Sequence, residues 1–356
     1  MRANVPARLR AHLMSLLLSC LFLLCAVGAA PVSAAPTGSA LQPQQLAIVI
    51  NDEDPHSVAV GAYYRKRRGI PAANVVHVRI PRVGNALPRS LSPARFRLLK
   101  EEIDSKLGPE VQAVLMVWTA PYAVDCNSIT AAYTLGFDGS QCVKTCAAGQ
   151  PSPYFNSKST RPWTDHGMRI SMLLPTEKVE QAKDLIDRGV AAGFRTVPAT
   201  AYYLATSEKA RNTRVGFFPR QGRIPGRRLS TKVIAADVLE GVKDILVYQT
   251  GMAQVAKLDT LGFVPGALAD HLTSLGGDLL GTSQMSSLRW LEAGATASYG
   301  TVSEPCNHWQ KFPNPSVLLR HYLSGNSAIE AYWKSVAWPA QGLFIGEPLA
   351  TPYRGR

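Results

Sequence analysis

The chain lacks several features that would assign it to a common class of protein. After its first 34 residues it has no apolar run long enough to cross a bilayer, so we expect no transmembrane anchor in the mature protein. It has no Gly-x-Ser-x-Gly elbow and no carboxylate pair that stands out, which disfavours a hydrolase of carbohydrate esters or glycosides. Cys142-x3-Cys146 has no partner pair at ligand spacing, so we expect no metal site, and no motif calls for a cofactor.

The N-terminus has the three parts of a secretory signal peptide. Three arginines among the first ten residues form its charged region, and residues 13–27 form a short apolar region. Val32-Ser33-Ala34 matches the small-residue rule for cleavage. We therefore expect residues 1–34 to be removed. Residues 35–356 would then form one exported domain, in the periplasm or outside the cell.

Basic residues are in excess, and acidic residues are missing from one long stretch. Removing the three signal arginines lowers the formal net charge from +13 to +10 (13 − 3). Residues 209–232 contain no Asp or Glu and are interrupted by Pro and Gly, so we interpret them as a long basic loop. The loop is either a solvated surface or a contact for an anionic polysaccharide or an acidic envelope partner. The arginines that would make this contact are Arg220, Arg223, Arg227 and Arg228. We expect no nucleic-acid partner, because the exported chain has no recognisable binding module.

Cysteine usage leaves two interpretations open. Four cysteines remain after export, three of them close together and one remote: Cys126, Cys142, Cys146 and Cys306. An oxidising compartment favours a disulfide within the first three, most simply Cys126 with Cys142 or Cys146, which would leave Cys306 free. In the alternative, all four cysteines pair.

Strand and helix signals alternate along most of the mature chain. Apolar runs at 46–50, 75–80 and 111–118 are separated by segments with helical spacing, and the turn 51–55 has residues that cap a helix. This alternation predicts an α/β fold with a mostly parallel, doubly wound sheet. Residues 120–165 interrupt it with three cysteines and several Gly and Pro, and we interpret them as a Cys-containing insertion.

The last quarter of the chain carries motifs that resemble those of a known family. They are Asp270-His271-Leu272-Thr273-Ser274, Gly276-Gly277, Ser298-Tyr299-Gly300-Thr301-Val302, Glu304-Pro305-Cys306, Lys311-Phe312-Pro313 and Gly346-Glu347-Pro348-Leu349-Ala350. Together with residues 51–71, they resemble an uncharacterised family of exported bacterial proteins found with exosortase (PEP-CTERM) sorting systems. That family has no established activity to carry over.

A more remote resemblance concerns the order of strands and reactive residues. A strand ending in His271, a later strand leading to Cys306 and a closing Gly-Glu-Pro-Leu are similar to the caspase–gingipain group of cysteine peptidases. This resemblance implies a caspase-like three-layer sandwich and a protein or peptide substrate. It also implies that His271 is the acid/base and Cys306 the nucleophile.

The surroundings of this predicted dyad supply further candidates and two departures. Gly276 and Gly277 are the candidates for an oxyanion-binding loop, and Glu304 or His308 would tune the thiolate. In the peptidase group a Gly usually follows the His directly and another follows the Cys closely, whereas Leu272 and Asn307-His308 occupy those positions here. The alternative of another class is a non-catalytic exported protein that binds a polyanion or a sorted surface protein.

Overall fold

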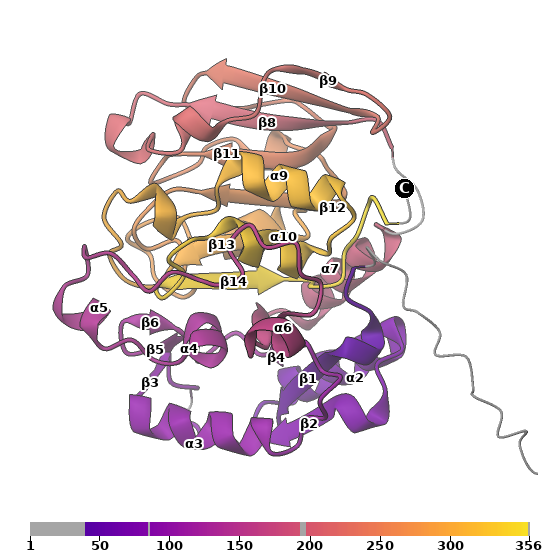
Figure 1. Cartoon of the computed structure of the whole chain (residues 1–356), viewed down its shortest axis with the longest axis vertical. Helices are drawn as coiled ribbons and strands as arrows, with labels where there is room; N and C mark the ends of the chain where they lie inside the picture. The colour runs from indigo at the N-terminus through magenta and orange to yellow at the C-terminus, as the bar shows by residue number, and fades with distance from the viewer. Residues whose placement is uncertain (1–39, 85, 193–196, 355–356) are drawn as a thin grey trace, which may run out of the picture. The chain divides into compact units, whose positions relative to one another are not determined.

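One large sheet organises the part of the chain that the structure describes, residues 40–84, 86–192 and 197–354 of this computed structural model (Figure 1). The predicted signal peptide lies outside these residues. All of the described residues belong to one compact unit. The sheet has 11 strands in the order β2-β1-β4-β7-β14-β13-β12-β11-β8-β10-β9, and three short strands form a second sheet in the order β3-β5-β6.

The strands of the two sheets are short and mostly buried. They run over β1 Leu46–Asn51, β2 Val75–Val78, β3 Ser90–Leu91, β4 Ala113–Val117, β5 Ala123–Val124, β6 Asn127–Ser128, β7 Ile170–Leu174, β8 Ala199–Ala205, β9 Gly222–Ile224, β10 Leu229–Ala235, β11 Ile245–Thr250, β12 Phe263–His271, β13 Ala297–Thr301 and β14 Gly342–Gly346.

Helices connect these strands and cover the sheet. They run over α2 Pro55–Arg68, α3 Pro93–Asp104, α4 Ile129–Leu135, α5 Ser140–Val143, α6 Pro162–His166, α7 Val179–Ala191, α8 Leu288–Glu292, α9 Pro315–Leu323 and α10 Ala328–Ser335, with 3-10 turns at η1 Pro43–Gln45, η2 Ala72–Asn74, η3 Lys209–Arg211, η4 Val215–Phe217, η5 Leu258–Thr260 and η6 Trp309–Lys311.

Most neighbouring strands are parallel, as the alternation of strand and helix signals predicts. β1 pairs in parallel with both β2 and β4, and β11 pairs in parallel with β8 and β12. The antiparallel pairs are β13 with β14 and β10 with β9 in the large sheet, and β5 with β6 in the small one. The predicted α/β class with a mostly parallel sheet is therefore confirmed.

The sheet lies between two layers of helices. In Figure 1, α9 and α10 lie in front of the sheet and α7 lies behind it, where α7 packs against α2. Every residue of β4 and β7 is buried, as expected of parallel strands that are covered on both faces. The result is the three-layer arrangement that the remote resemblance implies.

The turn after β1 shows why the local sequence folds as predicted. Asp54 precedes α2 and its side chain accepts a hydrogen bond from the backbone N–H of His56, while Pro55 occupies the first helical position. Gly69 ends the helix with φ +65°, in the left-handed region that glycine adopts without strain. These polar residues therefore cap a helix, as the sequence analysis expected of the turn 51–55.

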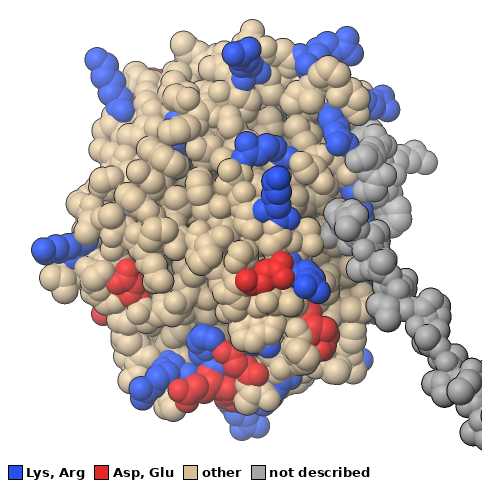
Figure 2. All heavy atoms as spheres, in the orientation of Figure 1, with Lys and Arg blue, Asp and Glu red and all other residues tan. Residues whose placement is uncertain are grey.

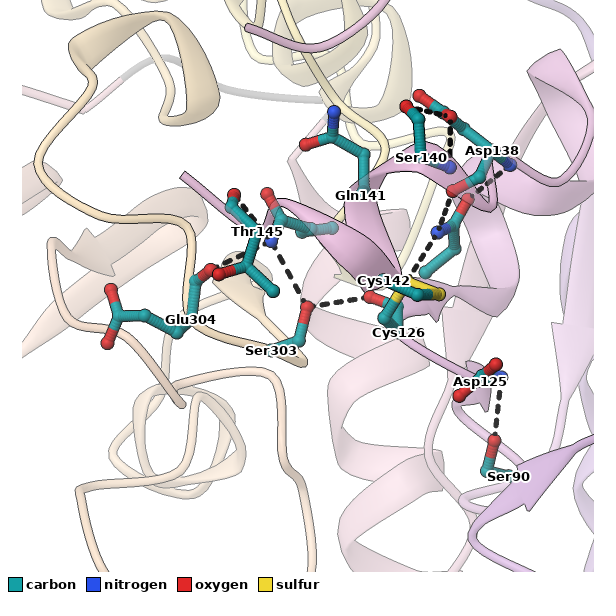
Figure 3. The surroundings of a disulfide bond; sticks show 12 residues. Ser90, Asp125, Cys126, Asp138, Ser140, Gln141, Cys142, Thr145, Ser303 and Glu304 are labelled. Atoms are coloured by element: carbon teal, nitrogen blue, oxygen red, sulfur yellow. Dashed lines mark hydrogen bonds between the residues drawn. A yellow bond between two sulfur atoms is a disulfide. The ribbon is translucent and has the colours of Figure 1, made fainter. Parts of the chain in front are cut away.

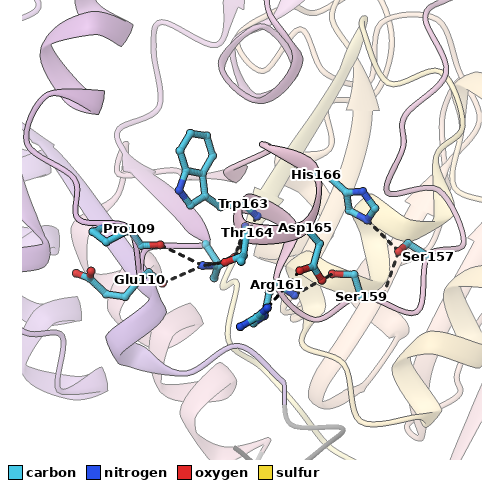
Figure 4. A network of polar contacts seen from close by, with 10 residues as sticks. Pro109, Glu110, Ser157, Ser159, Arg161, Trp163, Thr164, Asp165 and His166 are labelled. Carbon is cyan, nitrogen blue, oxygen red and sulfur yellow. Dashed lines mark hydrogen bonds and ion pairs between the residues drawn. The ribbon is translucent and has the colours of Figure 1, made fainter.

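The Cys-containing insertion at 120–165 is more regular than its sequence suggests. It contains α4, which packs on β7 and β14 and is buried along most of its length. Ser128 caps α4 by accepting from the backbone N–H of Ala131. Farther along, the Gln112 side chain accepts from the backbone N–H groups of Trp163 and Thr164, which ties α6 to the start of β4 (Figure 4). The insertion is thus part of the core as well as a surface feature.

The prediction of a long loop at 209–232 is wrong in part. Gly222–Ile224 and Leu229–Ala235 form the antiparallel pair β9 and β10 at the edge of the large sheet. Leu229 and Thr231 are buried while Lys232 is exposed, which is the alternation of a strand with one covered face. Of the Pro and Gly residues that suggested a continuous loop, Pro219 precedes β9, Gly222 is its first residue, and Pro225 and Gly226 lie between the two strands.

Candidate functional site

His271, the predicted acid/base, ends β12 inside the core. Its ring is completely buried, and both of its nitrogens have partners. Trp290 Nε1–H donates to Nδ1 at 2.9 Å, and Nε2 lies 3.0 Å from the backbone oxygen of Met285. The tautomer that satisfies both contacts carries its proton on Nε2 and donates it to Met285. Burial lowers the pKa of His271 to about 3, so the ring is neutral at physiological pH.

Cys306, the predicted nucleophile, is bonded to another cysteine. Its partner is Cys146 of the insertion, with the two Cα atoms 5.2 Å apart. Its backbone adopts φ +58°, and its N–H donates to the Glu304 side chain at 2.7 Å. Glu304 therefore contacts the backbone of this cysteine, and a sulfur held in a disulfide has no thiolate for a carboxylate to tune.

His271 thus ends one strand and Cys306 follows its neighbour, in the order that the peptidase resemblance implies, but the two do not form its dyad. β12 and β13 are neighbours and parallel, and Cys306 follows β13. In this structure, however, both ring nitrogens of His271 are hydrogen-bonded, one to Met285 and one to Trp290. The sulfur of Cys306 is in a disulfide with Cys146. The requirement for a free thiol beside a free imidazole nitrogen is not met.

The glycines after β12 serve a packing purpose. The N–H of Gly277 donates to the backbone oxygen of Thr301 at 2.8 Å, so it is not free to stabilise an oxyanion. The carbonyl of Gly276 accepts from the N–H of Ser287 at 2.7 Å. A Cβ on Gly277 would lie 2.5 Å from the backbone oxygen of Gly300. The pair lets the segment after β12 cross β13 in close contact.

The second disulfide joins Cys126 to Cys142 within the insertion (Figure 3). Beside it, the hydroxyl of Ser303 donates to the backbone oxygen of Cys126 at 2.7 Å, and the side chain of Gln341 donates to Ser303 at 3.2 Å. The four cysteines in the part of the chain that the structure describes are all paired. Of the two interpretations that the sequence left open, the structure has the one in which Cys306 is not free.

Lys311 is a buried cation that sequence reasoning missed. It lies close to both disulfides, and its ammonium donates to the Gln141 side chain, the backbone oxygen of Thr145 and the Gln341 side chain at 3.0, 2.6 and 2.8 Å. These three acceptors match the three donors of an ammonium. Burial lowers the pKa of Lys311 to about 8. The residue therefore fastens the insertion to the segment after β13.

His308, the other candidate near Cys306, also has a structural contact. Its Nε2 lies 2.9 Å from the backbone oxygen of Cys146, and its ring stands 5.8 Å from that of Trp338. The first contact holds the segment after Cys306 against the insertion, and the second holds it against the loop between α10 and β14. The disulfide, His308 and Lys311 therefore all join the segment after β13 to the insertion.

Asp270 lies on the face of β12 opposite to His271, as the alternation of a strand predicts. Its carboxylate is completely buried, pairs with the guanidinium of Arg214 and accepts from the side chain of Gln249 at 2.8 Å. Arg214 is buried too, and it also donates to the backbone oxygen of Thr250 at 2.9 Å. Arg214, one of the basic residues of the 209–232 segment, is thus held in an internal ion pair and is unavailable to a partner.

The other arginines of that segment lie on the β9–β10 edge. Arg220, Arg223 and Arg228 are exposed, and the guanidinium of Arg227 stands 5.7 Å from the centre of the Tyr353 ring. Within residues 40–84, 86–192 and 197–354, none of the four forms an ion pair with a carboxylate. On the face that Figure 2 shows, acidic side chains lie mainly in the lower half, and the upper half carries mainly basic ones. We call these four arginines the arginine edge.

Comparisons with known proteins assign no family to the chain. No family model matches, and no curated protein matches. A solved structure titled "Structure of Protease" is similar at a TM-score of 0.45 and 9% identity, over 88% of this chain and 79% of that one. Likeness at this level carries no activity from one chain to another.

Two structural features are absent from the residues that the structure describes. No group of three or more His, Cys, Asp or Glu in that part of the chain is arranged to hold a metal ion. None of the helices described there is long and apolar enough to span a membrane.

Proposed function

We propose that this chain is an exported, non-catalytic binding protein that holds an anionic polysaccharide of the cell envelope or extracellular matrix. The observation that carries the proposal is the arginine edge, four basic residues at the end of the sheet without a carboxylate partner among the described residues. The two disulfides support export, because such bonds persist in oxidising compartments.

The geometry of the edge suits a charged polymer. Arg223 lies on β9 opposite Ser230 of β10, while Arg227 and Arg228 occupy the connection between the two strands. Charges on a short hairpin are held at fixed spacing, whereas charges on a flexible loop are not. A guanidinium also binds carboxylate and sulfate groups with two parallel hydrogen bonds. Repeated carboxylates or sulfates along a polysaccharide would therefore meet several arginines at once.

The test compares binding of the mature protein, residues 35–356, to immobilised alginate and heparin at increasing salt. In the test variant the four arginines of the edge become Gln: Arg220, Arg223, Arg227 and Arg228. At about 0.5 kcal/mol for each exposed contact, we expect the variant to bind at least about tenfold more weakly and with less salt dependence.

A matched control removes the same charge elsewhere. It replaces four exposed basic residues that lie outside the edge, namely Arg65, Lys66, Arg95 and Lys144, by Gln. This control should bind like the unmodified protein. Equal losses in the two variants would show that binding follows net charge alone, and the proposal would then be wrong.

A cysteine peptidase is the second candidate, favoured by one observation. Cys306 follows β13, the parallel neighbour of the strand that ends in His271, as in the caspase–gingipain group. Activity would require reduction of the bond to Cys146 and release of His271 from Trp290 and Met285. Native alkylation before and after mild reduction, followed by a peptide-cleavage assay, tests this candidate. A Cys306→Ala variant that cleaves as well as the reduced parent would exclude it.

A further inference from the structure

A second basic feature lies away from the arginine edge, in a cavity of about 510 Å³ beside α9 and α10. Its walls come from the two helices and from the segment of the insertion that precedes α6. The lining residues are Ala40, Asn156, Lys158, Thr160, Arg320, His321, Ser324, Asn326 and Lys334. Three of them carry a cationic side chain and none is Asp or Glu. A cavity of this size holds a molecule as large as a monosaccharide.

Lys334 is the least expected member of this lining. It lies on α10 with 1% of its surface exposed, and its ammonium stands 5.0 Å from the centre of the Tyr154 ring. The ammonium donates to the side-chain oxygen of Asn326 at 2.6 Å. Within the described part of the chain, this is its one hydrogen bond, although an ammonium has three donors. Lys311, in contrast, has an acceptor for each of its donors.

The carboxylate of Glu330, which interacts electrostatically with Lys334, does not accept a hydrogen bond from its ammonium. Glu330 acts on Lys334 through the electrostatic field, but no ion pair joins the two side chains. One carboxylate oxygen of Glu330 accepts from the backbone N–H of Leu41 and from both the N–H and the hydroxyl of Ser327. The other carboxylate oxygen of Glu330 has no hydrogen-bond partner among the described residues and does not pair with Lys334, so donors of Lys334 remain for a ligand.

The opposite wall adds two further cations and a neutral ring. Arg320 and His321 both donate to the side-chain oxygen of Asn156, the latter at 3.1 Å. Burial, together with the charges of Lys334 and Arg320, lowers the pKa of His321 to about 4, so its ring is neutral. Lys158 and Arg320 are exposed at the rim. An anion that enters would meet these two charges first.

The wall is held in place before any ligand binds. Asn156 donates its backbone N–H to the backbone oxygen of Lys334 at 2.8 Å. Figure 4 shows the next contacts along the segment, Ser157 with the ring of His166 at 3.2 Å and Ser159 with Asp165 at 2.7 Å. Both contacts fix the backbone that carries Lys158. A preformed site loses little conformational entropy when a ligand binds.

From this geometry we propose that the cavity binds one small oxyanion group, a carboxylate or a phosphate. Lys334 donates to it from inside, and Lys158 and Arg320 bind it from the rim. The two sources of such a group are an acidic monosaccharide and free inorganic phosphate. The site is separate from the arginine edge, so it goes beyond the proposed binding of a polymer.

The experiment titrates the mature protein by calorimetry at constant ionic strength, set with sodium chloride. The probes are sodium phosphate, glucuronate and uncharged glucose. We expect saturable binding of phosphate or glucuronate and none of glucose. Tighter binding of glucuronate would identify the acidic sugar as the source, and tighter binding of phosphate the free ion. Absence of saturable binding of both anions would overturn the proposal.

Variants connect the binding to these residues. Lys334→Met should abolish it, and the surface variant Lys158→Gln/Arg320→Gln, which does not depend on a buried residue, should weaken it about tenfold. A control at Arg95→Gln/Lys144→Gln and the four-arginine variant should both retain it. If the surface variant binds like the parent, the cavity is not the site, whether or not Lys334→Met folds. Loss of polysaccharide binding alone would concern the arginine edge and leave this cavity unaffected.

Discussion

Cys306 is bonded to Cys146, which precedes it by 160 residues, so the segment after β13 is covalently joined to the insertion that follows β4. The other disulfide, Cys126–Cys142, spans 16 residues within the insertion itself. The two bonds therefore constrain the unfolded chain very differently, although both belong to the same region of the folded protein.

This difference in loop length gives the first prediction. Replacing Cys146 and Cys306 by Ala should lower the free energy of unfolding by about 5 kcal/mol, because the lost bond closes a long loop of the unfolded chain. Replacing Cys126 and Cys142 should cost about 3 kcal/mol. Urea denaturation of the two variants measures both losses. Four free thiols in the unreduced mature protein would contradict the pairing itself.

A second prediction concerns the pH dependence of stability. The pKa of His271 is about 3 in the folded protein and 6.5 for the free side chain, so between these values the unfolded chain binds the proton more strongly. Stability should therefore fall as the pH falls from about 6.5 towards 3, with a slope from this residue approaching about 1.4 kcal/mol per pH unit. His321, with its pKa lowered to about 4, adds to the same trend.

The variant His271→Asn separates these two contributions. It removes one titrating group, so its stability should depend less steeply on pH than that of the parent protein. It should also be less stable at pH 7 by about 2 kcal/mol, because partners at Trp290 and Met285 lose a hydrogen bond. Urea denaturation at pH 4, 5, 6 and 7 measures both effects. An unchanged slope would show that His271 is not buried as a neutral ring.

A third prediction uses the two adjacent glycines as a matched pair. Gly277→Ala places a Cβ 2.5 Å from the backbone oxygen of Gly300, and its other nearest neighbours are backbone atoms of Gly300 and Thr301, which cannot move aside as a flexible side chain can. We expect a loss of about 3 kcal/mol in stability. Gly276→Ala meets the edge of the His271 ring at 3.3 Å and should cost less. Thermal denaturation ranks the two, and the reverse order would disprove the close crossing of β13.

The fourth prediction concerns the ion pair inside the sheet. Arg214→Met leaves the buried carboxylate of Asp270 without its cation and should destabilise the fold by about 3–5 kcal/mol. Adding Asp270→Asn should restore part of that loss, because the uncompensated charge is then gone. Chemical denaturation of the single and double variants gives the coupling between the residues. Purely additive losses would show that the two side chains act independently.

Much of the fold could be predicted from the sequence because its signals are local. The apolar run of β1, the capping turn before α2 and the glycine that ends this helix lie within 24 residues, Leu46–Gly69, and each signal depends on its immediate neighbours. The edge pair β9–β10 was not predicted, because β10 joins the sheet through hydrogen bonds to β8, whose residues lie about 30 positions earlier in the chain. The buried helix α4 was hidden for a similar reason, since its partners are β7 and β14.

The candidate site was harder to predict, because its chemistry depends on pairing across the chain. The sequence shows that His271 ends an apolar strand, but not that Trp290 and Met285 occupy its nitrogens. It shows four cysteines and leaves their pairing open. Buried lysines such as Lys311 and Lys334 give no sequence signal, because their acceptors come from distant segments or loops.

The position of β14 in the sheet has a consequence for how this protein is made. Gly342–Gly346 lies between β7 and β13, near the centre of the sheet, although it is the last strand along the chain. Strands synthesised earlier therefore remain separated into two groups until these residues arrive. A chain that emerges from its N-terminal end first cannot finish its central hydrogen-bond ladder during elongation. Completion of the sheet therefore waits for the segment that follows α10, after every other strand that the structure describes has been synthesised.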